Sequence, residues 1–166
     1  MTRPFHYDVI IEKGHAPVND AIIKFIAAQI KGRYLDVGCN TGFLLETVPN
    51  GLGVDLSPVM VDIALAKGLL VRLADAEKLP FKDKEFDTVV LSCVLEQTEN
   101  WKRALSEAKR VGKRVIGICN YPDKSQWGRI GENPWVKSII PPEEIKGAHI
   151  MKFDELRYYF EVNCNG

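Results

Sequence analysis

Two glycines flank a short run of small residues at the end of an apolar segment. The stretch YLDVGCNTG, residues 34–42, passes from apolar residues through Asp36 to Gly38, and Gly42 closes it. Glycine lets the backbone turn sharply and approach a ligand closely, and such a turn before a helix can bind an anionic group. The G-x-x-x-G spacing does not meet the G-x-G-x-x-G fingerprint of dinucleotide binding, which argues against a nicotinamide cofactor. Taken alone, the two glycines are equally consistent with a simple strand-to-helix turn.

Two more aspartates follow apolar segments. Asp55 comes 13 residues after Gly42, at the end of GLGVD, and Asp75 follows the apolar segment 69–73. A carboxylate at a strand end can accept hydrogen bonds from both hydroxyls of a ribose. Asp75 could likewise accept from an adenine amino group while the backbone of Ala76 meets a ring nitrogen. Any one of these aspartates is more often a solvated loop residue or a helix cap, but three at successive strand ends favour an adenosine-containing ligand.

The segments that carry these residues alternate between strands and helices. Apolar runs predict strands at 33–37, 51–55, 69–73, 86–92 and 113–120, and helical periodicity predicts helices at 18–30, 43–48, 58–67 and, capped by Thr98, 99–111. Parallel strands need such crossovers, so the predicted fold class is α/β: an open, Rossmann-like, mostly parallel twisted sheet with helices on both faces. Ligands bind at the carboxyl ends of such strands. We therefore expect the chemistry at Asp36–Gly42, Asp55, Asp75 and Ser92–Gln97.

The composition indicates a soluble cytoplasmic protein. The chain has 166 residues, and 22 basic residues balance 22 acidic ones, so no net charge attracts nucleic acid or an anionic membrane. Charge comes too early for a secretory signal, and the run AIIKFIAAQI is short and interrupted by Lys24. Four dispersed cysteines contain no C-x-x-C pair, which argues against a metal site and suits a reducing compartment.

We expect a single domain spanning residues 1–166. Residues 1–31 would supply an N-terminal lid segment, with Phe5, Tyr7 and His15, and the first helix; residues 33–120 would form the ligand-binding core. Residues 121–166 would supply a substrate-side loop and a C-terminal helix over 153–160.

Three motifs carry a resemblance to a known family. LDVGCNTG, GVDLSPVMVDIA and ADAEKLPFKDKEFDTVVLSCVLEQTEN, in this order, resemble the class I S-adenosylmethionine-dependent methyltransferases, particularly the small-molecule group with the pattern D-A-x-x-L-P-F. The resemblance covers roughly residues 33–120. More narrowly, the stretch from LSCVLEQTENW through RVGKRVIGICNYPDKSQW is similar to the MetW-like methyltransferases of methionine metabolism.

The resemblance implies S-adenosylmethionine as cofactor, S-adenosylhomocysteine as product, and a role for each matching residue. Asp36 would orient the amino group, Asp55 would hold the ribose, and Ser92 would lie under the sulfonium. Gly38, Cys39 and Asn40, in the loop that Gly42 closes, would contact the methionine portion. Leu56 would pack on the face of the adenine, and Asp75 and Ala76 would bind its edge.

The sequence departs from the family pattern at three places. Asn40 replaces a usual glycine, but asparagine tolerates positive φ, so we expect binding to survive. Leu95-Glu96-Gln97 stands where many relatives carry a histidine. A helix over 153–160 leaves only residues 161–166 for the family's C-terminal hairpin, so the sheet is abbreviated, or FEVNCN supplies an edge strand, or the chain is a fragment.

Methyl transfer by in-line displacement can be accelerated by orientation alone, so the sequence assigns no catalytic residue. Glu96, His15 and His149 are the candidate bases if the acceptor must lose a proton, although a helix cap for Glu96 and surface or packing roles for the histidines are favoured. Cys93 is expected to be a small buried residue rather than a nucleophile.

Two functions from different classes follow. The first is an enzyme that methylates a small molecule, favoured by an insertion after the fifth strand with Trp127 and Trp135. The second is a cofactor-binding, non-catalytic module that acts as partner or regulator of another enzyme, slightly favoured by the missing hairpin. We expect a small-molecule substrate, no nucleic acid and no membrane, with a protein partner or a homo-oligomer left open.

Overall fold

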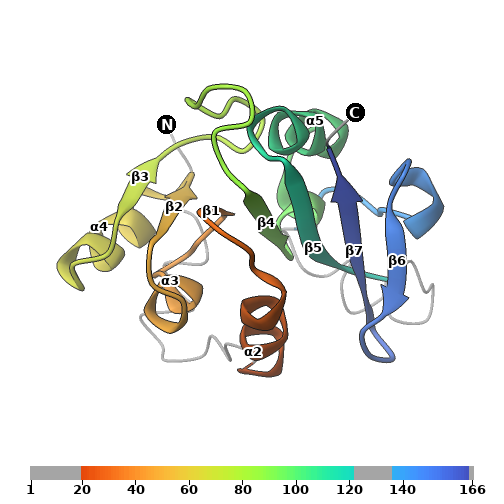
Figure 1. The fold of residues 1–166 in the computed structure, drawn as a ribbon, viewed down its shortest axis with the longest axis horizontal. Helices are drawn as coiled ribbons and strands as arrows, with labels where there is room; N and C mark the ends of the chain where they lie inside the picture. The colour runs from red at the N-terminus through yellow and green to blue at the C-terminus, as the bar shows by residue number, and fades with distance from the viewer. Residues whose placement is uncertain (1–19, 122–135, 165–166) are drawn as a thin grey trace.

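A seven-stranded sheet organises the residues that the computed structural model describes, 20–121 and 136–164 (Figure 1). The strand order is β3-β2-β1-β4-β5-β7-β6. The five parallel strands are β1 (Tyr34–Val37), β2 (Gly51–Asp55), β3 (Val71–Leu73), β4 (Thr88–Ser92) and β5 (Arg114–Asn120). The predicted fold class is therefore confirmed.

Helices cover both faces of the sheet. One apolar core packs α2 (Asp20–Gln29), α3 (Phe43–Thr47) and α4 (Pro58–Ala66) against one face, and a second core packs α5 (Trp101–Val111) against the other. Successive residues of β5 alternate between the two cores: Val115 joins the α5 side and Ile116 the α2 side. The central strands β1, β4 and β5 are thus buried on both faces, as the uninterrupted apolar runs predict, whereas β3 at the edge of the sheet exposes Arg72 and Leu73.

The predicted start of α4 is confirmed, whereas that of α5 is wrong. The Ser57 hydroxyl accepts a hydrogen bond from the Met60 N–H at 3.4 Å, and Pro58 occupies the first helical position. For α5 the cap is Asn100, whose side chain accepts from the Arg103 N–H at 3.1 Å. Thr98 instead closes the short 3-10 helix η1 (Leu95–Gln97) by donating to the Leu95 carbonyl at 2.8 Å.

The predicted C-terminal helix over 153–160 is wrong. Residues in this region form an antiparallel hairpin of β6 (His149–Lys152) and β7 (Arg157–Asn163), preceded by the 3-10 helix η2 (Pro142–Glu144). β7 also pairs with β5, so FEVNCN contributes to an internal strand and the sheet is not abbreviated. Tyr158 and Phe160 enter the α5-side core while Tyr159 enters the other, which explains why the aromatic run shows no alternation in the sequence.

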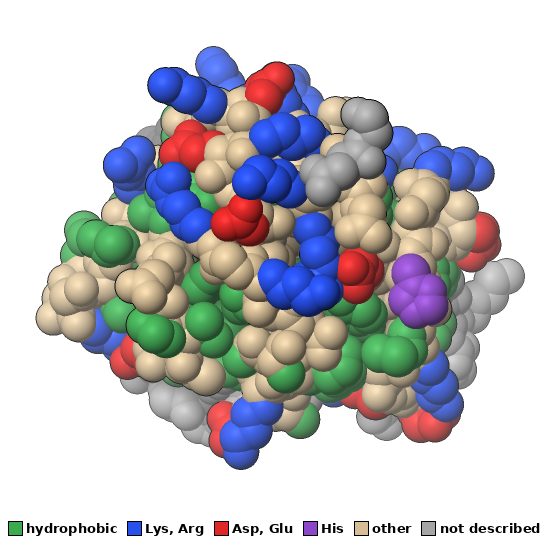
Figure 2. Space-filling view, viewed as in Figure 1, with side chains coloured by type: hydrophobic (Ala, Val, Ile, Leu, Met, Phe, Trp, Pro, Cys, Tyr) green, Lys and Arg blue, Asp and Glu red, His purple; other side chains and the backbone are tan. Residues whose placement is uncertain are grey.

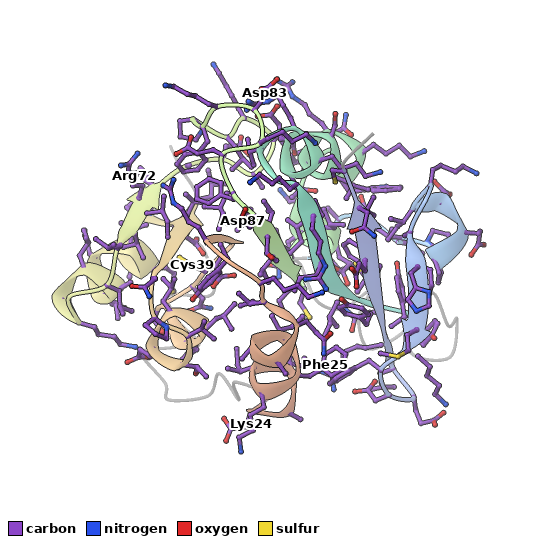
Figure 3. The ribbon with its side chains drawn as sticks, in the orientation of Figure 1. Lys24, Phe25, Cys39, Arg72, Asp83 and Asp87 are labelled. Atoms are coloured by element: carbon purple, nitrogen blue, oxygen red, sulfur yellow. The ribbon has the colours of Figure 1, made fainter. Side chains whose placement is uncertain are left out.

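A charged network ties this hairpin to the first helix. The Arg114 guanidinium donates to Glu161 at 2.6 Å and to the carbonyl of Gln29, at the end of α2, at 2.6 Å. Phe25 of α2, labelled in Figure 3, packs edge-on against Phe153 and Tyr159. α2 is therefore held against the C-terminal strands by both polar and aromatic contacts.

Basic and acidic side chains are interspersed on the face shown in Figure 2. Ion pairs between partly exposed side chains include Lys113 with Asp87 at 2.8 Å, Arg110 with Asp83 at 2.9 Å, and Arg33 with Glu85 at 3.4 Å. No helix within the two described ranges is long and apolar enough to cross a membrane. The predicted lid segment and the tryptophan-containing insertion lie outside the described residues.

Candidate functional site

A cavity of about 280 Å³ opens at the carboxyl ends of the parallel strands. Nine of the ten predicted cofactor-binding residues line it: Asp36, Gly38, Cys39, Asn40, Asp55, Leu56, Asp75, Ala76 and Ser92. These residues come from the ends of β1, β2 and β4 and from the segment after β3. The parallel topology thus brings together side chains that are far apart in the sequence.

Gly42, the tenth predicted residue, does not line the cavity. It caps α3 with a φ of 88°, and a Cβ built on it would lie 2.3 Å from a Leu69 methyl group. Its position therefore favours the turn-making role of a glycine over contact with a ligand.

Gly38 brings the backbone of the loop after β1 close to the opposite wall of the cavity. Its φ is 72°, and a Cβ built on it would lie 2.3 Å from a methyl group of Val94. The N–H groups of Gly38 and Cys39 both donate to the Val54 carbonyl, at 2.8 and 2.9 Å. The side chain of Cys39 (Figure 3) points toward β2, and a Cβ built on Gly53 of that strand would lie 2.7 Å from the Cys39 sulfur. The loop is therefore fixed to β2 and approaches Val94 as closely as a glycine allows.

Asn40 occupies the left-handed region with a φ of 53°, which confirms that asparagine supplies the conformation of the usual glycine. Its side-chain oxygen accepts from the Thr41 N–H at 2.6 Å. Its own N–H donates to Asp55 at 2.8 Å, and the Ser57 N–H donates to the other Asp55 oxygen at 2.9 Å. Because a carboxylate oxygen can accept more than one hydrogen bond, Asp55 is oriented in a manner that suits a diol.

Asp36 gives the cavity its unusual electrostatics. The side chain is only 5% exposed, and burial, with a smaller contribution from the charge of Asp55, raises the pKa of Asp36 to about 8. A positive charge in the cavity would reverse this effect by stabilising the carboxylate. The described lining residues include five carboxylates, Asp36, Asp55, Asp75, Glu77 and Glu99, against one cation, Lys137. The cavity is therefore suited to a cationic ligand.

The far wall of the cavity combines a polar turn with an exposed apolar side chain. Asp75 accepts a hydrogen bond from the Glu77 N–H at 2.8 Å, which orders the turn after β3. Leu56 follows Asp55 and is 51% exposed although it lines the cavity. An exposed leucine beside ordered polar groups offers a surface on which a flat ring can pack.

Comparison with known proteins agrees with this geometry. Residues 35–115 match the family described as a methyltransferase domain. The chain is 46% identical over 94 residues to an uncharacterized protein of Methanocaldococcus jannaschii, an alignment that covers 54% of this chain and 46% of that protein. It is 31% identical over 125 residues to the ubiquinone/menaquinone biosynthesis C-methyltransferase of Burkholderia mallei, covering 65% and 51%.

Residues 35–115 form a methyltransferase domain. The resemblance to methyltransferases noted in the sequence is thereby confirmed. A possible histamine N-methyltransferase of Thermotoga maritima has the same fold, with a TM-score of 0.73 at 19% identity over 88% of this chain and 89% of that structure. The chain spans about half the length of the two curated relatives named above. The narrower MetW-like resemblance stays a prediction.

The two candidate bases among the described residues, Glu96 and His149, do not line the cavity. Glu96 is 2% exposed and is not a helix cap: one carboxylate oxygen accepts from the Asn120 backbone N–H at 2.7 Å and from its side-chain amide at 2.9 Å. His149 lies exposed on β6, and His15 lies outside the described residues. Cys93 lines the cavity, but burial raises the pKa of its thiol to about 12, as expected for a neutral packing residue.

Several lining residues were not predicted from the sequence. Ile23 and Ile26 reach the cavity from α2, and Glu99 and Lys137 line its β4 side, next to Gln97, which lies within the predicted segment 92–97. The α2 residues show only the apolar periodicity of any core-facing helix, which carries no signal of a site. Lys137 lies in a turn-rich segment, and the contact that places it, its N–H donating to the Glu96 carbonyl at 2.7 Å, leaves no trace in the sequence.

Proposed function

We propose that this protein is an S-adenosylmethionine-dependent methyltransferase that acts on a small molecule. The observation that carries the proposal is the convergence of Asp36, Asp55 and Asp75 with the glycine turn on one cavity at the strand ends. Membership of residues 35–115 in the methyltransferase domain family supports the same activity.

The residues present fit this cofactor. S-adenosylmethionine carries a sulfonium and an ammonium, and the acidic lining is complementary to such charges. We propose that Asp36 holds the amino group, that Asp55, fixed by two backbone N–H groups, holds the ribose, and that Asp75 with Ala76 holds the adenine. The backbone of Gly38, Cys39 and Asn40 would face the methionine portion, Leu56 the adenine face, and Ser92 the sulfonium.

When bound, S-adenosylmethionine supplies an electrophilic methyl group to an acceptor. The described lining residues include no histidine, and the thiol of Cys93 is neutral, so orientation and exclusion of water are what these residues can contribute. We therefore assign no catalytic residue. The names of two similar proteins, a C-methyltransferase of ubiquinone/menaquinone biosynthesis and a possible histamine N-methyltransferase, support a small acceptor.

The alternative, a non-catalytic cofactor-binding module that regulates another enzyme, loses one of its arguments. The predicted absence of the family's C-terminal hairpin favoured this alternative, but β6 and β7 form such a hairpin. A protein partner, a homo-oligomer and a cytoplasmic location stay predictions.

Calorimetric titration of the purified protein with S-adenosylmethionine and S-adenosylhomocysteine tests the proposal. Asp55→Ala should weaken binding at least about tenfold, because it removes the charged acceptor for the ribose hydroxyls. Asp62→Ala, on the exposed side of α4, is the matched control and should bind normally. Release of S-adenosylhomocysteine with a panel of small acceptors would then establish the enzyme. Failure of the unchanged protein to bind either nucleoside would refute the proposal.

A further inference from the structure

We propose that Lys137 determines acceptor specificity and that the methyl acceptor carries an anionic group, a carboxylate or a phosphate. This inference rests on the proposed function, because it assumes that the cavity holds the cofactor and that the acceptor enters beside it. It adds the chemical class of the acceptor and the residue that recognises it.

Lys137 is the single positive charge among the described residues that line the cavity. It lies with Gln97, Thr98 and Glu99 on the wall formed by the segment after β4. The carboxylates assigned to the cofactor, Asp36, Asp55 and Asp75, come instead from the ends of β1 and β2 and the turn after β3. An anion that enters this acidic cavity would find its complementary charge only at Lys137 within the described lining.

The backbone of Lys137 is fixed by Glu96. The Glu96 carbonyl accepts from the Lys137 N–H at 2.7 Å and from the Ser138 N–H at 3.1 Å. The Glu96 carboxylate in turn accepts two hydrogen bonds from Asn120, the last residue of β5. Glu96 therefore acts as a positioning residue that holds Lys137 relative to both β5 and the wall after β4.

The ammonium group of Lys137 can exchange partners. It pairs with the Glu99 carboxylate, and the side chains of Lys137 and Glu99 are 40% and 78% exposed. An ion pair so open to water is weak, so an incoming anion can replace Glu99 with little loss.

Glu77, the other acidic lining residue not assigned to the cofactor, already accepts a hydrogen bond within the protein. Glu77 accepts a hydrogen bond from the Asn100 N–H at 2.7 Å, which joins the turn after β3 to the start of α5. Its carboxylate thus has a structural role in the wall. The lining therefore favours an anionic acceptor at Lys137 over a cationic one at Glu77.

The test uses the full-length protein saturated with S-adenosylhomocysteine and labelled with ¹⁵N. Benzoate, phenyl phosphate and the neutral benzamide are titrated separately while amide signals are followed by NMR. We expect at least one of the two anions, but not benzamide, to shift the signals of Lys137 and Gln97, and the stronger of the two identifies the anionic group. Lys137→Gln should weaken anion binding about fivefold or more. Lys102→Gln removes the same charge from an exposed ion pair with Glu144, outside the cavity, and should change nothing.

Equal binding of benzamide and benzoate would overturn the inference, as would the absence of shifts with both anions at millimolar concentration. It would also be overturned if Lys137→Gln weakened the binding of S-adenosylhomocysteine itself, because Lys137 would then hold the cofactor. Failure of the unchanged protein to bind S-adenosylhomocysteine would instead contradict the proposed function.

Discussion

Asp36 and Asp55 lie near the ends of adjacent strands and line the same cavity, and the charge of one raises the pKa of the other. The register of β1 and β2 pairs Asp36 with Gly53, so Asp55 lies two residues further along, where the loop after β1 turns over it. Asp55 is held by the N–H groups of Asn40 and Ser57, whereas Asp36 is 5% exposed. Burial therefore raises the pKa of Asp36 beside a carboxylate that two backbone N–H groups already hold.

The stability of the ligand-free protein should fall as pH rises because of Asp36. Its pKa in the folded state, about 8, lies above the ordinary value of 3.8, so the folded state binds the proton more tightly between these two pH values. The stabilisation from this proton is fully present below pH 3.8 and is lost as the pH rises to about 8. The free energy of unfolding then falls by up to about 1.4 kcal/mol per pH unit. Asp36→Asn should flatten the dependence of the free energy of unfolding on pH, measured by urea denaturation from pH 5 to 8. If the free energy of unfolding of Asp36→Asn changed with pH as steeply as that of the unchanged protein, this prediction would be wrong.

Cofactor binding should release a proton from Asp36. Below pH 8 the empty site holds this proton, and a bound ammonium group would favour the ionised carboxylate, so affinity should rise with pH up to about 8. Above that pH the affinity should fall, since an α-amino group loses its proton, and with it its positive charge, near about pH 8. Calorimetry with S-adenosylhomocysteine at pH 6.5, in two buffers of different ionisation enthalpy, should show about one proton released. Asp36→Asn is expected to release none.

Gly38→Ala should both destabilise the protein and abolish nucleoside binding. The substitution strains a residue with a φ of 72° and places its Cβ 2.3 Å from Val94 in the cavity wall. Gly68→Ala is the matched control, because Gly68 has a φ of 78° but no atom within 4 Å of the added Cβ. We expect about 1–2 kcal/mol of destabilisation for Gly68→Ala with binding intact, and a larger loss for Gly38→Ala. Equal effects of the two variants on unfolding and on binding would disprove the close approach.

Breaking the pair of Arg114 and Glu161 should loosen α2 from the C-terminal hairpin. The side chains are only 10% and 24% exposed, and Arg114 also holds the end of α2. Glu161→Gln should lower the free energy of unfolding at pH 7 by about 2 kcal/mol, between the values for exposed and buried pairs.

Arg114 lowers the pKa of Glu161, so the stabilisation is present above the ordinary pKa of a glutamate and lost as pH falls through the lower folded value. Acid titration of stability should therefore show a smaller loss in Glu161→Gln than in the unchanged protein. Glu155→Gln, which removes a carboxylate 86% exposed, is the control and should change stability little. A Glu161→Gln protein as stable as this control would show that the pair contributes nothing.

The strand ends were predictable because their signals are local. Apolar runs that stop at Asp36, Asp55 and Asp75 predicted three neighbouring strands, and parallel topology requires their carboxyl ends to meet at one edge. Asn40 was equally readable, since its tolerance of positive φ belongs to the residue itself. The position of the cavity therefore followed from residue types, spacing and a general rule of topology.

The C-terminal hairpin, the orientation of Glu96 and the placement of Lys137 were decided only by the tertiary structure. β7 lies between β5 and β6 and is buried on both faces, so its aromatic run has no period that distinguishes a strand from a helix. Glu96 turns inward because Asn120 offers it donors, and Lys137 reaches the cavity because Glu96 binds its N–H. The sequence by itself determined which residues face the strand ends; long-range hydrogen bonds and two-sided burial, which local sequence patterns do not encode, decided the rest.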